Sequence, residues 1–342
     1  MLRHITLVSF LAALLATACR REAPLPGTRE QPVPAPKTLS VYSGRSETLI
    51  APLLDRFSKQ SGIKVNTRYG ETAELAAMLL EEGKNSRADL FIAQDAAALG
   101  AVEQAGLFRA LPDEVRSRVP SRFVHPDGSW IGLSGRARTV VYNSKSMTPE
   151  ALPQALDNVV DRRWRGRFGI APANASFQAH LAVYRVVHGR EALARLLRDM
   201  ARNEPKRYSK NSAIVDAVIA GEIEWGLVNH YYLWQALKQR PDAPAANFFM
   251  PKGDASSFIN LAGVGVMSPK RDAIELVRFL LSDEAQRYFA SETYEYPVVP
   301  GIDAAVDLVP LSEVRTPEVN FADVSAVLGE TLTMLQESGL LE

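Results

Sequence analysis

The sequence predicts an α/β protein of two lobes, and two observations favour this fold class. From residue 38 onward, short β-prone runs alternate with amphipathic helical patterns, which is typical of parallel sheets covered by helices on both faces. About 300 residues follow that point, more than one hydrophobic core usually holds. We therefore expect one lobe from residues 38–135 plus approximately 262–312, and a second from residues 136–261 plus approximately 313–342.

The first third of the chain gives the clearest alternation of elements. Residues 39–43 form a β-prone run, and apolar residues then recur at helical spacing over 47–60 until Gly62 ends the pattern. The same reasoning predicts strands over 63–69 and 89–93, and helices over 72–82 and 96–105. Ligands of such folds bind beyond the carboxyl ends of the strands, so the candidate site loops are 43–47, 69–72 and 93–96.

Later elements indicate where the chain passes between the lobes. We predict strands over 139–142, 226–229 and 264–267, and helices over 282–292 and 324–340. Crossings near residues 134–138 and 260–265 would place two adjacent strands in a hinge. The folded part contains no internal repeat of fixed period, so these boundaries depend on the pattern of elements alone.

The N-terminus has the layout of a secretory signal. Residues 1–18 hold a short basic stretch, an apolar run over 5–15 and small residues before Cys19. The apolar run is shorter than the roughly 20 residues that cross a bilayer. Leu-Ala-Thr-Ala-Cys resembles a bacterial lipobox, which favours a lipid on Cys19, while ordinary signal-peptidase cleavage at the same bond stays open. Residues 19–37, rich in proline, then form a lipid-anchored or free linker, and we expect the protein in the periplasm or cell envelope.

Composition excludes several classes of site and partner. Cys19 is the only cysteine, so neither an internal disulfide nor a thiolate metal cluster can form. Basic and acidic residues both number 39, and no basic stripe argues for nucleic acid. The sequence holds no Gly-x-Ser-x-Gly elbow, phosphate loop or HExxH motif. We therefore expect a monomer that binds a small ligand and catalyses no reaction.

Five segments in order carry a resemblance to a known family. They read VYSGRSETLIAPLLDRFSKQSGIKV, RYGETAELAAMLLEEGKNSRADLFIAQDAAALGAVEQAGLF, GLSGRARTVVYN, NASFQA and GLVNHYY, followed by ETYEYP. Together they resemble the bacterial periplasmic ferric-ion-binding proteins over essentially residues 38–342. The resemblance implies a type II periplasmic-binding-protein fold, with two lobes, a β-strand hinge and an interlobe cleft that holds Fe(3+). It also implies delivery of the iron to the permease of an ABC importer.

The resemblance points to Tyr231 and Tyr232 as metal ligands, and the chemistry agrees. Fe(III) is a hard cation that prefers anionic oxygen ligands, and a bound cation can deprotonate a phenol near neutral pH. Neighbours on a strand point to opposite faces, so both phenols reach one ion only from a turn or a first helical turn. Residues 225–228 indicate a strand that ends at Asn229, a good helix cap, and residues 233–238 indicate a helix. Taken alone, the pair could instead pack in a core or line a sugar site.

The rest of the ligand set departs from the family pattern. Ser46 stands where the family often has a histidine, and Gln94 where it has a glutamate. Tyr142 matches a third tyrosine that some members use as a ligand. With three phenolates and no first-lobe histidine, we expect a synergistic anion, carbonate or phosphate, to complete the coordination. The candidate anion contacts are Ser134, Gly135, Arg136, Asn174, Asn229 and Arg45, with Arg138 and Tyr42 as further candidates for the cleft.

Two rival functions follow from the same sequence. A protein of the same fold could bind a polyamine, a sugar or an oxyanion, because the fold alone does not choose the ligand. A ferric-tyrosinate enzyme would need open coordination positions and normally two histidines beside the tyrosines. His230 is adjacent to the pair, but its family counterpart is variable, and His125, His180 and His188 have no metal-ligand spacing. Iron transport therefore ranks above both rivals.

Overall fold

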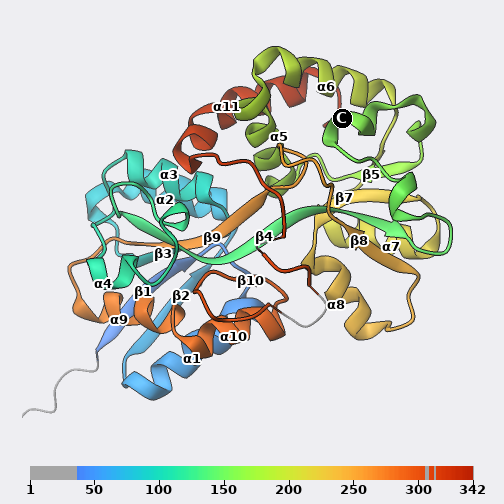
Figure 1. Ribbon diagram of the computed structural model, residues 1–342. Helices are drawn as coiled ribbons and strands as arrows, with labels where there is room; N and C mark the ends of the chain where they lie inside the picture. The colour runs from blue at the N-terminus through green and yellow to red at the C-terminus, as the bar shows by residue number, and fades with distance from the viewer. Residues whose placement is uncertain (1–36, 305–307, 312, 342) are drawn as a thin grey trace, which may run out of the picture. The chain divides into compact units, whose positions relative to one another are not determined.

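The computed structural model describes residues 37–304, 308–311 and 313–341 (Figure 1). Cys19, the predicted signal and nearly all of the predicted linker lie outside these residues. No helix within the described ranges is long and apolar enough to span a bilayer.

The first elements alternate as the sequence predicts. Gly62, with a φ of 70°, ends the first helix, because a left-handed backbone is open to glycine at little cost. The elements are β1 (Thr38–Ser43), α1 (Glu47–Ser61), β2 (Lys64–Tyr69), α2 (Thr72–Glu82), β3 (Leu90–Ala93) and α3 (Ala96–Gln104). Because β1 pairs in parallel with both β2 and β3, the carboxyl ends of all three strands lie at one edge of the sheet.

Two strands continue this sheet toward the second half of the chain. β9 (Ile259–Val266) pairs antiparallel with β3, and β4 (Trp130–Asn143) pairs antiparallel with β9 (Figure 1). β4 is far longer than the predicted strand 139–142. Two glycines and two arginines interrupt the apolar pattern before Thr139, although the structure buries this whole stretch.

β4 changes partners at its middle. Ala137 is the last residue paired with β9, and Arg138 is the first paired with β7 (Trp225–Asn229). The strand order is β2-β1-β3-β9-β4-β7-β5-β6, with β8 and β10 pairing β4. The remaining strands are β5 (Phe168–Ile170), β6 (Lys206–Arg207), β8 (Ala245–Phe248) and β10 (Tyr296–Pro297).

Helices of the second half begin where its parallel strands end. β5 leads to α5 (Ala175–His188), β6 to α7 (Asn211–Ala220) and β7 to α8 (Tyr231–Gln239). Since β6 and β7 both run parallel to β5, the three helix N-termini lie at the same sheet edge. The other α-helices are α4 (Asp113–Arg116), α6 (Arg190–Arg202), α9 (Arg271–Leu280), α10 (Asp283–Glu292) and α11 (Phe321–Glu337). Short 3-10 helices cover Gly83–Asn85, Ser121–Phe123, Pro149–Ala151, Leu156–Val160 and Arg162–Trp164.

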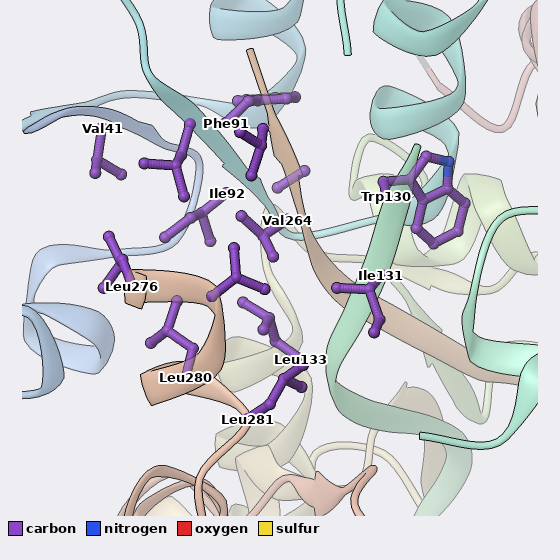
Figure 2. Close-up of a cluster of buried hydrophobic side chains, with 14 of the residues drawn as sticks. Val41, Phe91, Ile92, Trp130, Ile131, Leu133, Val264, Leu276, Leu280 and Leu281 are labelled. Carbon is purple, nitrogen blue, oxygen red and sulfur yellow. The ribbon is translucent and has the colours of Figure 1, made fainter. Parts of the chain in front are cut away.

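Buried apolar side chains gather in separate clusters. Figure 2 shows part of the first, where Phe91 and Ile92 of β3 lie near Val264 of β9. A second cluster holds the far end of β4 with α5, α6 and β7, including Trp225 and Phe168 stacked with ring centroids 4.6 Å apart. Helix α11 contacts both α3 and α5. The expected lobe boundaries remain a prediction.

Candidate ligand site around two tyrosines

The two predicted metal tyrosines lie in the first turn of α8. The buried strand β7 ends at Asn229, and the helix begins at Tyr231. The rings of Tyr231 and Tyr232 stack with centroids 4.4 Å apart and planes 29° apart. The expectation of a first helical turn is therefore confirmed. The two phenol rings therefore lie side by side.

The predicted helix cap is wrong. Asn229 is the last residue of β7, and His230 stands between it and the helix. The amide of Asn229 is engaged elsewhere: its Nδ2 donates to Ser176 Oγ at 3.0 Å, and its Oδ1 accepts from Arg138 Nη1 at 3.3 Å. Asn229 therefore joins strand β4 to the start of α5.

Burial keeps Tyr232 protonated in the free protein. Loss of solvent raises the pKa of Tyr232 well above its ordinary value, and Tyr231 acts in the same direction. Arg136 and Arg138 oppose this rise without overcoming it. Ionisation of this phenol near neutral pH therefore requires a strong cation beside its oxygen.

Two buried arginines accompany the tyrosines. Arg136 is 2% exposed and Arg138 is 1% exposed, and they occupy alternate positions of β4. Arg136 donates to Gln94 Oε1 at 3.0 Å, and Arg138 donates to Asn211 Oδ1 at 3.0 Å. Burial lowers the pKa of Arg138 to about 9, so the side chain stays charged at neutral pH.

Both guanidinium groups have N–H groups that could donate to a ligand. Within the described residues, the Nε and Nη2 atoms of Arg136 and Arg138 are buried and have no hydrogen-bond partner. Among the described residues, the Nδ2 of Asn211 is likewise buried without a hydrogen-bond partner. Buried charges with unsatisfied N–H groups are costly, and an oxyanion is the ligand that would satisfy several of them at once.

Three other anion candidates are engaged by Glu295 or by neighbouring strands instead. Arg45 is engaged by Glu295, with its two Nη atoms at 3.2 and 2.7 Å from the carboxylate oxygens. Ser134 Oγ also donates to Glu295, at 2.8 Å. Gly135 is paired with β9 on one side and with Tyr296 of β10 on the other. These contacts occupy Arg45, Ser134 and Gly135 within the framework, and their predicted contact with an anion stays a prediction.

Asn174 acts as a helix cap in this structure. It precedes α5, and its side-chain oxygen accepts from the Ser176 backbone N–H at 3.1 Å. Ser176 in turn accepts from Asn229, so both asparagines surround the start of α5.

Tyr142 does not join the tyrosine pair. In the β4–β7 ladder, Tyr142 lies opposite Trp225, whereas Arg138 lies opposite Asn229. Four residues of strand separate these positions by about 13 Å. Tyr142 packs in the apolar cluster around Trp225, and its predicted role as a third ligand stays a prediction that the register does not favour.

The remaining candidates come from the first three β–α units of the chain. Tyr42 donates to Glu82, the last residue of α2, so its hydroxyl is engaged there and its predicted place in the cleft stays a prediction. Ser46 is exposed and precedes α1, with its Oγ 3.4 Å from Thr48 Oγ1. Gln94 alone of the three is joined to the site, through Arg136.

Sequence reasoning missed several contributors. Asn211, Ser176 and Glu295 carry polar side chains that are almost fully buried. The signal for Ser176 was present, because it lies in the NASFQA segment, and Glu295 lies in ETYEYP. Nothing in the pattern around Asn211 distinguishes it from the first residue of an ordinary surface helix.

His230 is not free to coordinate. Its Nδ1 accepts from the Ala137 backbone N–H at 3.1 Å, and its Nε2 donates to the Tyr294 carbonyl at 2.8 Å. Burial lowers its pKa to about 4, so the imidazole is neutral. Both ring nitrogens are occupied.

A second group of metal-type side chains was not expected. His125 Nδ1 lies 2.6 Å from Asp127 Oδ1, and its Nε2 lies 3.8 Å from Glu103 Oε2. The three offer ligand atoms within 4.8 Å of one another. Within this group, Asp127 is within hydrogen-bond distance of Nδ1, whereas Glu103 lies beyond that distance from Nε2. A pocket of about 870 Å³ borders His125 and the segments 121–130, 253–259 and 311–321, and no predicted site residue lines it.

Comparison with known proteins identifies the family to which the chain belongs. The model of the bacterial extracellular solute-binding protein family matches residues 85–323. The chain belongs to this family. This extracellular solute-binding protein is 30% identical over 318 residues to the major ferric iron-binding protein of Neisseria meningitidis serogroup A, covering 90% of this chain and 94% of that protein. It is 29% identical over 313 residues to iron uptake protein A1 of Synechocystis, covering 88% and 87% respectively.

Solved structures agree with this solute-binding protein in fold. Iron-bound HitA from Pseudomonas aeruginosa superposes with a TM-score of 0.83 at 27% identity, over 89% of this chain and 100% of that one. A Trichodesmium protein solved with iron and citrate ligands superposes with a TM-score of 0.78 at 26% identity, over 88% and 99%. The predicted type II periplasmic-binding-protein fold and the resemblance to ferric-ion-binding proteins are confirmed.

Proposed function

We propose that this solute-binding protein captures ferric iron outside the cytoplasm and delivers it to an ABC importer. The observation that carries the proposal is the stacked Tyr231–Tyr232 pair beside two buried arginines with donors to offer. Relatives named as ferric iron-binding and iron uptake proteins support the choice of ligand.

Tyrosine chemistry suits this cargo. Two adjacent phenolates supply hard anionic oxygen ligands, which Fe(III) prefers over softer donors. Burial raises the pKa of Tyr232, so this phenol ionises when a highly charged cation is present, and binding of iron releases protons. A site of this type discriminates against cations of lower charge.

The arginines supply the second half of the proposed site. Arg136 and Arg138 would hold a synergistic anion, carbonate or phosphate, that fills coordination positions left by the tyrosines. Asn211 and Asn229 surround Arg138 and would fix its orientation. Gln94, held by Arg136, is the first-lobe group nearest this anion, so few protein ligands come from the first lobe.

Transport requires motion and docking rather than catalysis. We propose that the lobes, bounded as the sequence predicts, close over the iron around the strands β4 and β9. Closure excludes water and strengthens charged contacts at the site. The closed monomer would then dock on the permease, with a lipid on Cys19 as its attachment to the membrane.

Binding of an oxyanion without metal is the second candidate function. The unsatisfied donors of Arg136 and Arg138 favour it specifically, because two buried cations attract an anion whether or not iron is present. The tyrosine pair argues against it, since an oxyanion does not need two adjacent phenols.

A titration of metal-free protein tests the proposal. A ferric chelate added with bicarbonate or phosphate should produce the visible phenolate-to-iron absorption band and raise the melting temperature. The double variant Tyr231→Phe, Tyr232→Phe should lose both effects. Tyr208→Phe serves as a matched control, because that tyrosine bonds only Glu222 at the surface. A wild type that stays colourless, but is stabilised by phosphate alone, would replace iron by an oxyanion as the ligand.

A further inference from the structure

His230 connects three parts of the molecule that meet beside the tyrosine pair. It is completely buried and directly precedes α8. Its Nδ1 accepts from the backbone N–H of Ala137, the residue at which β4 changes partners. Its Nε2 donates to the carbonyl of Tyr294, 64 residues further along the chain. Both bonds come from one neutral imidazole tautomer, because Nδ1 faces a donor and Nε2 faces an acceptor.

The backbone of His230 is fixed as well. Its N–H donates to the Ala137 carbonyl at 3.0 Å, and its own carbonyl accepts from Asn247 Nδ2 at 2.8 Å. The ring lies edge-on to Tyr231, with centroids 5.8 Å apart and planes at 90°. These hydrogen bonds and the ring contact therefore fix the position of the backbone where the chain enters α8.

Helix α8 rests on the chain segment 292–296 through more than this one residue. The ring of Trp234 stacks against Tyr294 at 6.4 Å, and Lys238 pairs with Glu292 at 3.6 Å. The ring of His230 lies 4.7 Å from that of Tyr296. Among these contacts, only the His230 imidazole is both fully buried and hydrogen-bonded to the segment's backbone.

The same segment is fastened on its other side to residues of the first lobe. Glu295 binds Arg45, which follows β1, and also Ser134 of β4. Tyr294 has a φ of 57°, a left-handed conformation that costs free energy for a residue with a side chain. That conformation presents the Tyr294 carbonyl to His230 while Glu295 stays on Arg45.

We propose that His230 is a positioning residue that holds the Tyr231–Tyr232 pair in register with the segment 292–296 and with the turning point of β4. The inference depends on the proposed iron-binding function. His230 does not touch the metal, because both ring nitrogens are occupied. It acts by fixing where α8 begins, so loss of its two bonds lets the phenol oxygens shift relative to Arg136 and Arg138.

Three substitutions of His230 test its hydrogen bonds to Ala137 and to Tyr294 separately. In His230→Asn, the side-chain oxygen replaces Nδ1 as acceptor for Ala137, but the side chain is too short to reach Tyr294. In His230→Gln, the longer amide retains a donor near Nε2 for Tyr294 and loses the bond to Ala137. His230→Phe keeps a ring and loses both bonds. His188→Gln is the matched control, since His188 lies at the end of α5 beside Asp254.

The test measures iron release into a competing chelator and the position of the visible absorption band. His230→Phe should release iron about 10- to 100-fold faster than wild type and shift the band, as loss of an outer-shell contact does in metal sites. The release rates of His230→Asn and His230→Gln should lie between those of wild type and His230→Phe. The release rate of His188→Gln should match that of wild type. If the Phe variant fails to fold, the Asn and Gln variants decide.

Two results would overturn the proposal in distinguishable ways. If wild type gives the band but all three His230 variants keep its release rate and wavelength, and only melt at lower temperature, His230 is a packing residue. If wild type itself gives no band with any ferric chelate, the proposed function fails and the role of His230 fails with it.

Discussion

At the scale of single residues, we expect Arg136 to lower the stability of the free protein and to strengthen ligand binding. It is a buried cation with one hydrogen-bond acceptor, Gln94, so its desolvation is poorly offset. We expect Arg136→Met to leave the free protein as stable or more stable by about 1 kcal/mol. The same change should weaken iron binding in phosphate about tenfold, because a charged hydrogen bond contributes about 1.5–3 kcal/mol. Thermal melts without anions and iron titrations at fixed phosphate measure the two effects.

The control for this exchange is an arginine at the surface. Arg207 on β6 is exposed and bonds the Gly339 carbonyl, so Arg207→Met should change neither quantity much. Loss of stability in Arg136→Met, with unchanged iron affinity, would instead identify Arg136 as part of the framework.

Individual residues were predicted best where local sequence decides their position. The start of α8 brings Tyr231 and Tyr232 together, and that follows from the strand and helix patterns around them. The partner of Arg45 could not be predicted, because Glu295 is 250 residues away and meets it only after the sheet has formed. The position of Tyr142 could not be predicted for a related reason: the β4–β7 register, which a sequence does not reveal, decides which end of β4 lies near the pair.

At the scale of elements, the Arg45–Glu295 pair fastens the segment 292–296 to the loop after β1. Burial raises the pKa of Glu295, but Arg45 and Arg136 outweigh it, and the pKa lies below its ordinary value. We expect Glu295→Gln to lower the free energy of unfolding by about 3–5 kcal/mol, because it leaves Arg45 buried without a counter-charge. Arg45→Met should cost a similar amount. Urea unfolding measures both.

A double-mutant cycle distinguishes the pair from general damage. Arg45→Met with Glu295→Gln together should cost clearly less than the sum of the two, since no uncompensated charge remains. Glu292→Gln breaks the exposed pair with Lys238 and should cost below about 1 kcal/mol. Fully additive effects would mean that the two side chains act independently.

Elements themselves were predictable where amphipathic patterns are regular. The alternation up to α3 follows the apolar spacing, and Gly62 marks a true helix end. Only part of β4 could be predicted from the sequence. Its first half pairs with β9 and β10 and is buried throughout, so it lacks the regular apolar alternation of a strand with one exposed face. Polar residues such as Arg136 are also buried in this half of the strand, which hides it from a search for apolar alternation.

At the scale of the whole molecule, the two-lobe prediction followed from chain length and from repeated β–α alternation, and similarity to relatives extends over about nine-tenths of the chain. What the sequence could not reveal is how buried polar groups link the parts. His180 is one example, on α5, fully buried, with its Nε2 donating to the Ala255 carbonyl at 2.5 Å. Burial, reinforced by Arg138, lowers the pKa of His180 to about 3.

This histidine should make folding stability depend on pH. The unfolded chain binds a proton at His180 below about pH 6.5, whereas the folded protein does not until near pH 3. Stability contributed by His180 is therefore complete above about pH 6.5 and falls as the pH decreases, by about 1.4 kcal/mol per pH unit. His180→Gln keeps a donor for Ala255 and cannot titrate. Urea unfolding of iron-free protein between about pH 6.5 and pH 5 should give a slope shallower by one proton in the variant. Equal slopes would mean that His180 is protonated in the folded state, and that Arg138 does not face a neutral imidazole.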